Sequence, residues 1–550
     1  MKPEDLRDAA FPKLTDEQLA ILEHCPLTKV KLYRAGAKIF EAGQSNLSFY
    51  VVKCGEVAVV DDARDTPQVV AVHGRGEFTG DVAVLTGTPS LVSAVARVDS
   101  ELYEVSPEAL RLILNTHVDL GDIIVQAFIA RRHLQRESAE YSSLRVIGSR
   151  YSRDTFRVRD FLAKNRVPFT WFDLETDKQV TCLLQRLGIP DSDTPVVIWG
   201  SKLLLRNPSD RELAEALGLR RLLQDSIYDL VVVGAGPAGL AAAVYGASEG
   251  LRTMTLERIA PGGQAGRSMR IENYLGFPAG ISGGDLAERA VVQANKFGAE
   301  LPVAVEVVGL RFDSSYLVVH VDGGQQVVAK CLLISTGADY RTLTAPGCEE
   351  FEGRGVYYAA TPVEAQMCWG SDVVVVGGGN SAGQAAVFLS AHVRTVYLVV
   401  RGDDLHKSMS SYLIERIRLI PNIRVLLNTE VRALYGDQYL REVELVDKTT
   451  GEIRRLKCAA LFSFIGAAPR TEWLPPEIEK DDHGFVLTGP ALVQSSRWRE
   501  QRRQPFLVET SRPGVFAVGD ARAGSIKRVA SAVGEGAMAV QFIHQYLSAM

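Results

Sequence analysis

The sequence has few features typical of proteins with structural disulfides, of nucleic-acid-binding proteins or of metal-dependent proteins. Its 7 cysteines in 550 residues include no pair at Cys-x-x-Cys spacing. This scatter argues against a disulfide framework or a zinc site, so we expect reduced thiols and no metal. The formal net charge is -5 and no run of like charge stands out, so neither nucleic acid nor an anionic membrane is implied as a partner.

Targeting signals are also missing. The N-terminal stretch MKPEDLRDAAF lacks the basic and apolar regions of a signal peptide, so we expect a cytoplasmic protein. One uncharged stretch, Leu230 to Ala247, is long enough to span a bilayer, but it contains the glycines and proline of a nucleotide-binding loop. We therefore expect no membrane span, and we expect small molecules or proteins as partners.

The length predicts three or four domains. Short apolar runs alternate with turns as far as Val105 and a helical segment follows, which predicts a β-barrel or jelly roll with trailing helices over residues 1–142. Residues 143–223 alternate strands and helices as a small α/β unit. Two strand-glycine-helix openings follow, which predict Rossmann-like three-layer α/β domains. The first is formed by residues 224–345 and 465–550, with the second inserted at 346–464.

The first glycine loop lies in YDLVVVGAGPAGLAAAVYGA. A buried strand is followed by Gly234, Gly236 and Gly239, and then by a helix. The first glycine permits the tight turn, the second lets a pyrophosphate approach the backbone, and the third lets helix and strand pack closely. The next strand ends at Glu257, where a carboxylate can accept ribose hydroxyls. This context predicts a dinucleotide site.

The second loop, GGGNSA, has Gly377, Gly379 and Ala382 in the same positions. At the place that corresponds to Glu257 there is Val400, and no carboxylate. Arg401 follows directly and Lys407 lies in the same turn region. The absence of the acid and the presence of cations favour the 2'-phosphate of NADPH over NADH.

The alternative is that both cations are ordinary surface residues, since Asp403 and Asp404 dilute the local charge.

From Tyr228 to the C-terminus the chain resembles the low-molecular-weight thioredoxin reductases. The shared motifs occur in order: GAGPAG, PGGQ with IENYLGFP, STGA, GGGNSA, FIGAAPRT, and GVFAVGDAR followed by KRVASAVGEG. The resemblance implies FAD and NADPH as cofactors, a homodimer, and these FAD-binding residues: Gly234, Gly236, Pro237, Ala238, Gly239, Glu257, Gly263, Gln264, Asn273, Thr336, Gly337, Gly519, Asp520, Arg528, Val529 and Ala530. The implied NADPH-binding residues are Gly377, Gly379, Asn380, Ser381, Arg401, Lys407, Ile465 and Gly466.

The family's redox dithiol is missing. Its Cys-Ala-Thr-Cys tetrad becomes Ala359, Ala360, Thr361 and Pro362, and neither a methyl group nor a proline ring can act as a nucleophile. This replacement argues against reduction of thioredoxin through a resident disulfide. The acidic residue that follows the tetrad in the family is Val363 here, and Glu364 is a weak substitute one position later.

Two single cysteines remain as redox candidates. Cys368 is the nearest thiol to the missing dithiol, and Cys348 has no better claim. Packing is the alternative role for both, because free cysteines are commonly buried and inert.

The N-terminal region resembles the cyclic nucleotide-binding fold in EAGQSNLSFYVVKCGEVAVV and GRGEFTGDVAVLTGTPSLVSAVA. Binding members use a glutamate for the ribose and an arginine for the cyclic phosphate. Here those positions hold Asp81 and Ser90, and without the arginine the bidentate ion pair is lost. We expect the fold to be kept and cyclic-nucleotide binding to be lost, which leaves protein docking or dimerisation.

The middle unit resembles a glutaredoxin or thioredoxin-like domain. Its active-site position reads Ser149-Arg150-Tyr151-Ser152 in place of Cys-x-x-Cys, and Thr194-Pro195 resembles the proline turn that faces that site. Serine is a favoured helix N-cap, so a spacer or docking surface is expected.

Together these features predict an NADPH-dependent FAD oxidoreductase that passes electrons to an unidentified acceptor without a resident dithiol. Two alternatives stay open at this point. One is a ferredoxin or flavodoxin reductase, or a direct reductase of quinones or disulfides. The other is a flavin redox sensor with little turnover, for which three units without their characteristic reactive residues would be suited.

Overall fold

The computed structural model describes residues 3–61, 68–90, 92–137, 144–177, 180, 184–185, 188–199, 203–220, 223, 226–499 and 503–550. We name four units within it. The N-terminal unit is residues 3–137 and the middle unit is residues 144–220. The FAD unit (226–345 and 465–550) and the NADPH unit (346–464) are named after the dinucleotide that the sequence predicts for each. The predicted domain joints near Ser142 and Gln224 lie outside the described residues.

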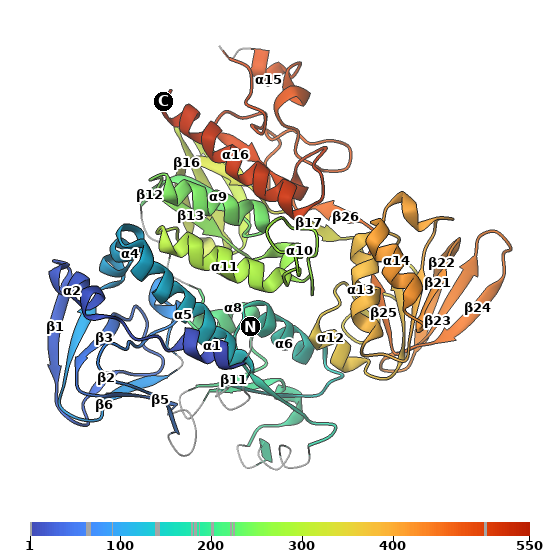
Figure 1. The fold of residues 1–550 in the computed structure, drawn as a ribbon. Helices are drawn as coiled ribbons and strands as arrows, with labels where there is room; N and C mark the ends of the chain where they lie inside the picture. The colour runs from blue at the N-terminus through green and yellow to red at the C-terminus, as the bar shows by residue number, and fades with distance from the viewer. Residues whose placement is uncertain are drawn as a thin grey trace.

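The N-terminal unit is a sandwich of two antiparallel sheets with helices at one side (Figure 1). The first sheet has the order β1-β7-β3, with β1 Thr28–Tyr33, β3 Phe49–Cys54 and β7 Ser100–Val105. The second has the order β2-β6-β4-β5, with β2 Lys38–Phe40, β4 Val57–Asp61, β5 Gln68–His73 and β6 Ser93–Ala96. The helices are α1 Pro3–Ala10, α2 Asp16–His24, α3 Val82–Thr86, α4 Pro107–Thr116 and α5 Val118–Glu137.

The middle unit has a four-stranded mixed sheet of order β11-β10-β8-β9, in which only β8 and β9 run parallel. Its elements are β8 Leu144–Gly148, α6 Arg153–Lys164, β9 Thr170–Asp173, η2 Asp191–Asp193, β10 Val196–Trp199, β11 Leu203–Arg206 and α8 Asp210–Ala216. The Thr194–Pro195 peptide bond is cis. One of the predicted helices of this unit, in the stretch VTCLLQRLG (180–188), lies largely outside the described residues.

In the FAD unit, a central sheet of order β13-β12-β16-β15-β14, with β27 beside β16, is covered by α9, α11 and α16 (Figure 1). The strands are β12 Ile227–Val233, β13 Thr253–Leu256, β14 Val307–Asp313, β15 Tyr316–Val321, β16 Gln326–Ile334 and β27 Val515–Ala517. The helices are α9 Pro237–Ser248, α10 Gly263–Gly266, α11 Gly283–Lys296, η3 Asp322–Gly324, η5 Gly489–Leu492, α15 Ser496–Arg499, η6 Gly519–Ala521 and α16 Val529–Leu547.

The NADPH unit has a parallel sheet of order β18-β25-β19-β20-β21 and an antiparallel sheet β22-β23-β24. Its strands are β18 Val356–Tyr357, β19 Asp372–Val376, β20 Thr395–Val399, β21 Ile423–Leu426, β22 Thr429–Gly436, β23 Leu440–Asp447, β24 Ile453–Lys457 and β25 Ala460–Ser463. Its helices are α12 Pro362–Met367, α13 Asn380–Ser390, η4 Leu405–Lys407 and α14 Ser411–Leu419. A two-stranded ribbon, β17 Ala338–Tyr340 and β26 Ala467–Pro469, joins this unit to the FAD unit.

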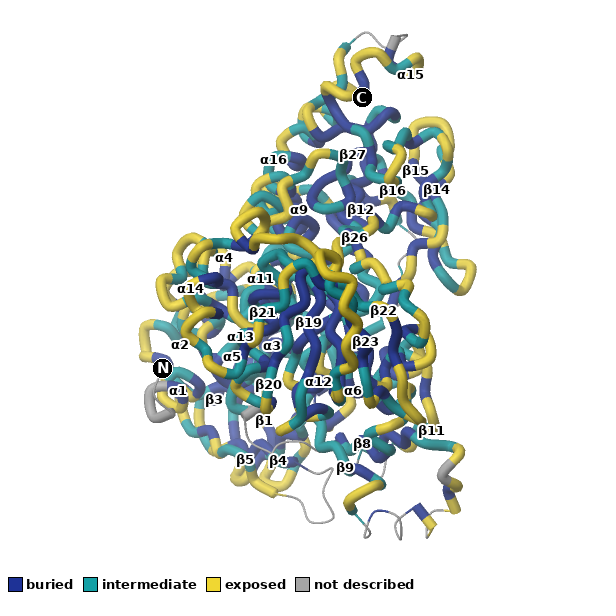
Figure 2. The backbone as a smooth tube through the Cα atoms, turned by 90° about the vertical axis from the view of Figure 1, so that its right-hand side faces the viewer, coloured by how far each residue is buried: buried dark blue, intermediate teal, exposed yellow. Residues whose placement is uncertain are grey.

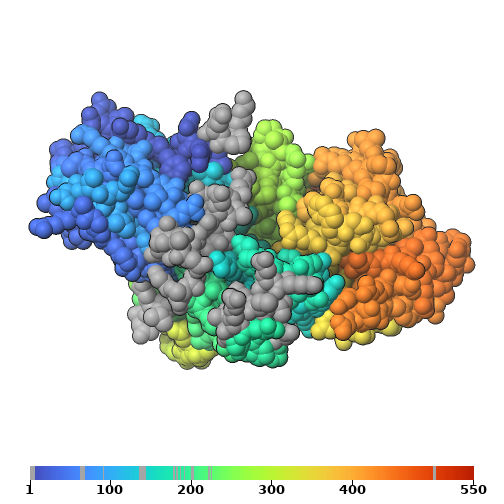
Figure 3. All heavy atoms as spheres, turned by 90° about the horizontal axis from the view of Figure 1, so that it is seen from below, coloured from blue at the N-terminus to red at the C-terminus, as the bar shows by residue number. Residues whose placement is uncertain are grey.

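The apolar residues of the central strands explain why helices cover the sheets of the two dinucleotide-binding units. The run VVVV of β19 is buried on both faces of its sheet, as parallel strands require, and Figure 2 shows it among the deepest segments. Figure 3 shows the middle unit between the N-terminal unit and the NADPH unit on one face of the molecule. The predicted fold class, with a β-rich N-terminal domain followed by two Rossmann-like domains, is confirmed. Within the described residues, no helix is both long enough and apolar enough to cross a membrane.

Candidate functional site

A cavity of about 1430 Å³ lies where the FAD unit, the NADPH unit and α6 of the middle unit meet, and residues of α3 also line it. Pockets for a single ligand usually measure about 300–1,000 Å³. This cavity is larger than that range and can hold parts of two dinucleotides. The predicted FAD-binding residues that line it are Gly234, Gly236, Pro237, Ala238, Glu257, Gly263, Gln264, Asn273, Thr336, Gly337, Gly519, Asp520, Arg528, Val529 and Ala530. Gly239 lies behind this wall, in the contact between helix and strand.

The first loop is built around glycine. Gly234 has φ +100°, and a Cβ on it would lie 2.5 Å from the Ser335 carbonyl oxygen. A Cβ on Gly239 would lie 1.9 Å from the Gly234 carbonyl oxygen, so only glycine allows α9 to pack this closely on β12. Gly236 is the N-cap of α9 and gives no side-chain cap. The first amide groups of α9 therefore stay available to an anion.

Glu257 ties the loop to the next strand. Its Oε2 accepts a hydrogen bond from the Ala235 amide (2.7 Å), and its Oε1 accepts from the amides of Ile259 (2.9 Å) and Ala260 (3.2 Å). Burial raises the pKa of this carboxyl. A carboxylate offers about four lone-pair sites, so Oε2 keeps one for a hydroxyl in the cavity.

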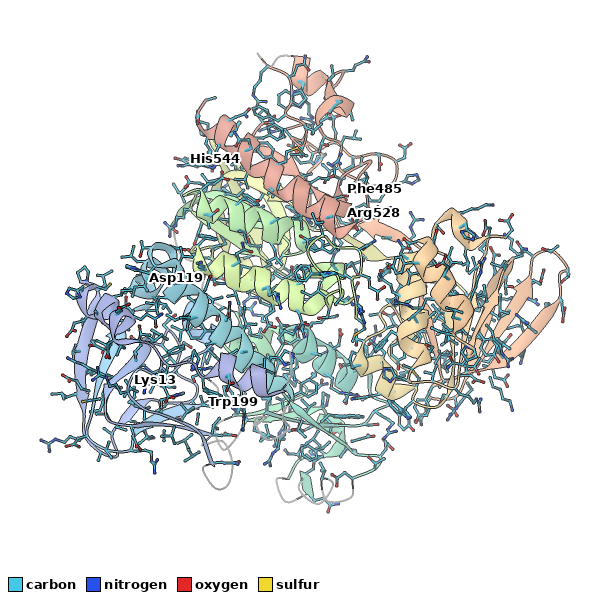
Figure 4. The ribbon with its side chains drawn as sticks, in the orientation of Figure 1. Lys13, Asp119, Trp199, Phe485, Arg528 and His544 are labelled. Atoms are coloured by element: carbon cyan, nitrogen blue, oxygen red, sulfur yellow. The ribbon has the colours of Figure 1, made fainter. Side chains whose placement is uncertain are left out.

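Two further features of the wall suit a bound flavin dinucleotide. Gln264 donates from Nε2 to the Ala338 carbonyl (3.3 Å), while its Oε1 is buried with no partner in the described part of the chain. Such an orphaned acceptor in a cavity calls for a ligand donor. The long helix α16 begins after Arg528 (Figure 4), again without a side-chain cap, and burial raises the pKa of Asp520 next to it in the wall.

The second loop opens onto the same cavity. Gly377 has φ +143°, and a Cβ there would lie 2.5 Å from the Phe464 carbonyl oxygen. Gly379, the uncapped N-cap of α13, lines the cavity together with Asn380, Ser381 and Gly466. The Tyr340 hydroxyl donates to Ser381 Oγ (3.0 Å) and so links the connecting ribbon to α13.

The remaining predicted NADPH residues lie away from the cavity. Gly377 is set back in the turn, Ile465 is 38% exposed, and Arg401 is exposed at the end of β20. Lys407 Nζ forms an ion pair with Asp403 Oδ1 at 2.6 Å, on the surface. The selection of NADPH by the two cations stays a prediction.

At the position of the missing dithiol, the structure has a capped helix start. Thr361 is the N-cap of α12, Pro362 is its first residue, and Glu364 closes a capping box by accepting from the Thr361 amide (2.8 Å). The sequence T-P-x-E carries this signal, which our sequence analysis missed. Ala359 and Ala360 are buried, whereas Thr361, Pro362 and Val363 line the cavity. Glu364 is thus used by the helix and is 1% exposed.

Neither single thiol is placed for redox chemistry. Cys368 is 1% exposed, its Sγ donates to the Glu364 carbonyl (3.3 Å), and burial raises its pKa to about 12. Burial also raises the pKa of Cys348 to about 11. The thiolate is the nucleophile, so burial disfavours the reactive form of both thiols. Among the described residues, no cysteine lines the cavity and no cluster could hold a metal; Cys182 lies outside them.

In the N-terminal unit, the predicted ligand positions are occupied internally. The Asp81 side chain accepts from the Ala83 amide (2.7 Å) and caps α3, and Arg132 lies 3.8 Å from it. Ser90 is buried and its hydroxyl donates to the Val92 carbonyl (2.7 Å). Both side chains thus make contacts within their own unit, and the loss of cyclic-nucleotide binding stays a prediction.

In the middle unit, Ser152 caps α6 through the Thr155 amide, as predicted (3.2 Å). Ser149 and Arg150 bond to Glu175 and Asp173 within the unit. Tyr151 instead leaves its own unit and stacks on Tyr439 of the NADPH unit, with ring centroids 3.9 Å apart. The turn at residues 149–152 therefore takes part in a contact between the middle unit and the NADPH unit.

Comparison with known proteins matches residues 228–536 to the pyridine nucleotide-disulphide oxidoreductase family and residues 30–117 to the cyclic nucleotide-binding domain. Curated relatives include a thioredoxin reductase of Treponema pallidum (strain Nichols), 37% identical over 59% of this chain and 98% of that protein. Another, from Bacillus subtilis (strain 168), is 32% identical over 59% of this chain and 96% of that protein.

Among solved structures, Lactococcus lactis thioredoxin reductase in the FR conformation aligns with TM-score 0.53 and 28% identity, over 59% of this chain and all of that one (100%). T. acidophilum thioredoxin reductase aligns with TM-score 0.52 and 30% identity, over 58% and 98%.

Proposed function

The chain belongs to the pyridine nucleotide-disulphide oxidoreductase family, and on that premise we propose that it is an NADPH-dependent FAD oxidoreductase whose acceptor is reduced without a resident dithiol. The two curated relatives described above are thioredoxin reductases. The observation that carries the proposal is that both glycine loops open onto one cavity, while a capped helix start occupies the position of the family's dithiol.

In this proposal the FAD unit holds its dinucleotide by backbone groups. The uncapped N-termini of α9 and α16 direct amide donors and positive dipole ends at the phosphates. The free lone pair of Glu257 accepts a ribose hydroxyl, and the orphaned Oε1 of Gln264 accepts a ligand N–H or O–H. These residues fit FAD because each supplies a group that the protein itself leaves unpaired.

NADPH is bound by the second loop. The amides that begin α13 take the pyrophosphate, and Arg401 pairs with the 2'-phosphate at the open end of β20. When bound, the nicotinamide supplies a hydride and the flavin accepts it and passes electrons on. The chain's part is to bring the two rings together, and the apolar Pro362 and Val363 exclude water from that part of the cavity wall.

The exit for electrons differs from that of the relatives. Three residues of this turn face the cavity: Thr361, whose hydroxyl is bonded to Glu364, and the apolar Pro362 and Val363. None of these side chains can form a mixed disulfide. The acceptor therefore meets the flavin position itself. Ferredoxin or flavodoxin, quinones and small disulfides are the acceptor classes to compare, and we propose a homodimer as the working assembly.

The test is an anaerobic NADPH titration of the full-length yellow protein, followed by separate addition of thioredoxin, ferredoxin, a quinone and a small disulfide. Cys368→Ser is measured in parallel. We expect NADPH to bleach the flavin absorbance and at least one acceptor to restore it, at equal rates in both proteins. NADPH oxidation that stays at background with every acceptor, despite bound FAD, would contradict the enzyme. A loss of acceptor reduction in Cys368→Ser would contradict the thiol-free exit.

A further inference from the structure

Helix α6 of the middle unit lies across the junction between the two dinucleotide-binding units. It has 12 residues and so spans about 18 Å. In Figure 1 it lies beside α12 and below α11, and contacts between α6 and α12 are present in the structure. The two ends of α6 contact different units.

The N-terminal half of α6 packs on the NADPH unit. Phe156 joins the hydrophobic core of that unit and contacts Tyr357, with ring centroids 5.3 Å apart. The Arg159 side chain is 2% exposed, and its Nη2 donates to Gln366 Oε1 on α12 at 2.9 Å. The same guanidinium lies 3.6 Å from the centroid of Trp171 in its own unit, so it is held from both sides. Burial lowers its pKa to about 10, and it stays charged at neutral pH.

The C-terminal half of α6 packs on the FAD unit. Phe161 and Leu162 share one hydrophobic core with Val303 and Ala304 of that unit. The Asn165 amide donates to the Ile259 carbonyl at 2.9 Å, just beyond Glu257. Arg166 lies 3.6 Å from Asp285 at the start of α11.

The other links between the two units are local. The Tyr340 hydroxyl bonds to Ser381 Oγ (3.0 Å), and the Tyr340 ring meets Phe464 edge-on with ring centroids 5.3 Å apart. The β17–β26 ribbon has only two strands, and such a ribbon is marginally stable alone. Arg416 and Glu272 form an ion pair at 2.9 Å in which the Arg416 side chain is 43% exposed, and exposed pairs contribute about 0–1 kcal/mol. Units joined this way are expected to move relative to each other.

We propose that α6 is a positioning element for hydride transfer, which fixes the NADPH unit against the FAD unit so that both glycine loops face one cavity. The proposal rests on the proposed function. The middle unit thereby acquires a role, since α6 packs against α12 while Pro362 of α12 faces the cavity. Reaction rates depend steeply on such placement, because an error of about 1 Å can cost about 100-fold.

The test uses the full-length holoenzyme with the double variant Phe156→Ala/Arg159→Leu, which removes the contacts of these two α6 side chains with Tyr357 and Gln366 of the NADPH unit. Arg157→Ala is the matched control: Arg157 lies on the same helix but bonds to Asp210 (2.7 Å) and the Pro208 carbonyl (2.8 Å) within its own unit. Four quantities are measured: FAD content, the KM for NADPH, the limiting rate of flavin reduction at saturating NADPH, and amide hydrogen exchange of residues 362–367.

In the double variant we expect unchanged FAD content, faster exchange in α12, a KM for NADPH within about twofold of wild type, and a limiting rate at least about tenfold lower. Arg157→Ala should match the wild type in all four. An unchanged limiting rate with α12 exchanging faster would overturn the proposal, and so would an equal loss of rate in Arg157→Ala.

If the double variant does not retain FAD, Tyr151→Ala decides, because Tyr151 is on the surface of the same contact and is 38% exposed. A smaller loss of limiting rate supports the proposal, and an unchanged rate overturns it. A wild-type flavin that NADPH does not reduce would contradict the proposed function itself. Equal reduction in wild type and variants would contradict only the role of α6.

Discussion

The two glycine loops share the same strand-turn-helix pattern, but they differ in the residue at the third glycine position and in the carboxylate that follows the next strand. In the first, Gly239 lies against the Gly234 carbonyl so closely that no Cβ fits, and Glu257 bonds the loop to the following strand. In the second, Ala382 takes the third position, fully buried, and Val400 stands where the carboxylate would be. The first loop, held by the Glu257 hydrogen bonds, suits a resident cofactor, whereas the second loop has no such carboxylate and suits a substrate that exchanges.

The largest effect is expected from Gly239→Ala. The added Cβ would lie 1.9 Å from a backbone oxygen that cannot move aside, and overpacking of this kind costs about 1–3 kcal/mol. We expect protein without FAD and with a lower Tm. The control is Gly534→Ala in α16, where a Cβ meets nothing within 4 Å; there the Tm should stay or rise. Normal FAD content in Gly239→Ala would remove the distinction between the loops.

A matched pair compares the second glycine of each loop. In Gly236→Ala the nearest atom to the new Cβ is at 4.0 Å, and in Gly379→Ala it is at 3.9 Å, so both folds should survive. We expect Gly236→Ala to lose FAD because the methyl blocks the approach of the pyrophosphate. Gly379→Ala should keep FAD and raise the KM for NADPH about tenfold. Absorbance of the purified proteins and steady-state kinetics separate the two, and loss of FAD in both would contradict the assignment of the loops.

Arg401→Ala should weaken the second site selectively. A charged hydrogen bond contributes about 1.5–3 kcal/mol, so we expect the kcat/KM for NADPH to fall about tenfold or more while that for NADH stays constant. Equal losses with both nucleotides would show that Arg401 does not face the 2'-phosphate.

The smallest effect is expected from Lys407→Ala. Lys407 is already paired with Asp403, and both side chains are mostly exposed, so the pair contributes little. The kcat/KM for NADPH should change by no more than about twofold. A change as large as that of Arg401→Ala would mean that Lys407 leaves Asp403 for the nucleotide.

Local patterns in the sequence predicted much of this molecule. The glycine spacing located both loops, and Ser152, a residue type that favours helix N-caps, caps α6. The capping box at Thr361 was equally readable. Each of these signals lies within a few residues, where backbone geometry dictates residue type.

The contacts that place the units could not be predicted. Phe156 meets Tyr357 and Arg159 meets Gln366 across some 200 positions of chain, and neither segment carries a mark of its partner. The position of Lys407 is another case, since its pairing with Asp403 depends on the turn around η4. Such contacts depend on packing between elements that are distant in the sequence. The periodicity of apolar residues indicates only that one face of an element is apolar, and not which element covers it.

The central claim is that electrons leave this enzyme without a resident dithiol, and the stoichiometry of anaerobic reduction tests it most directly. One NADPH delivers two electrons, which one FAD accepts in full. Without a resident disulfide, we expect the titration of the wild-type holoenzyme to end at about one NADPH per FAD. A second equivalent of NADPH consumed per FAD before the endpoint would reveal a redox-active disulfide and contradict the account.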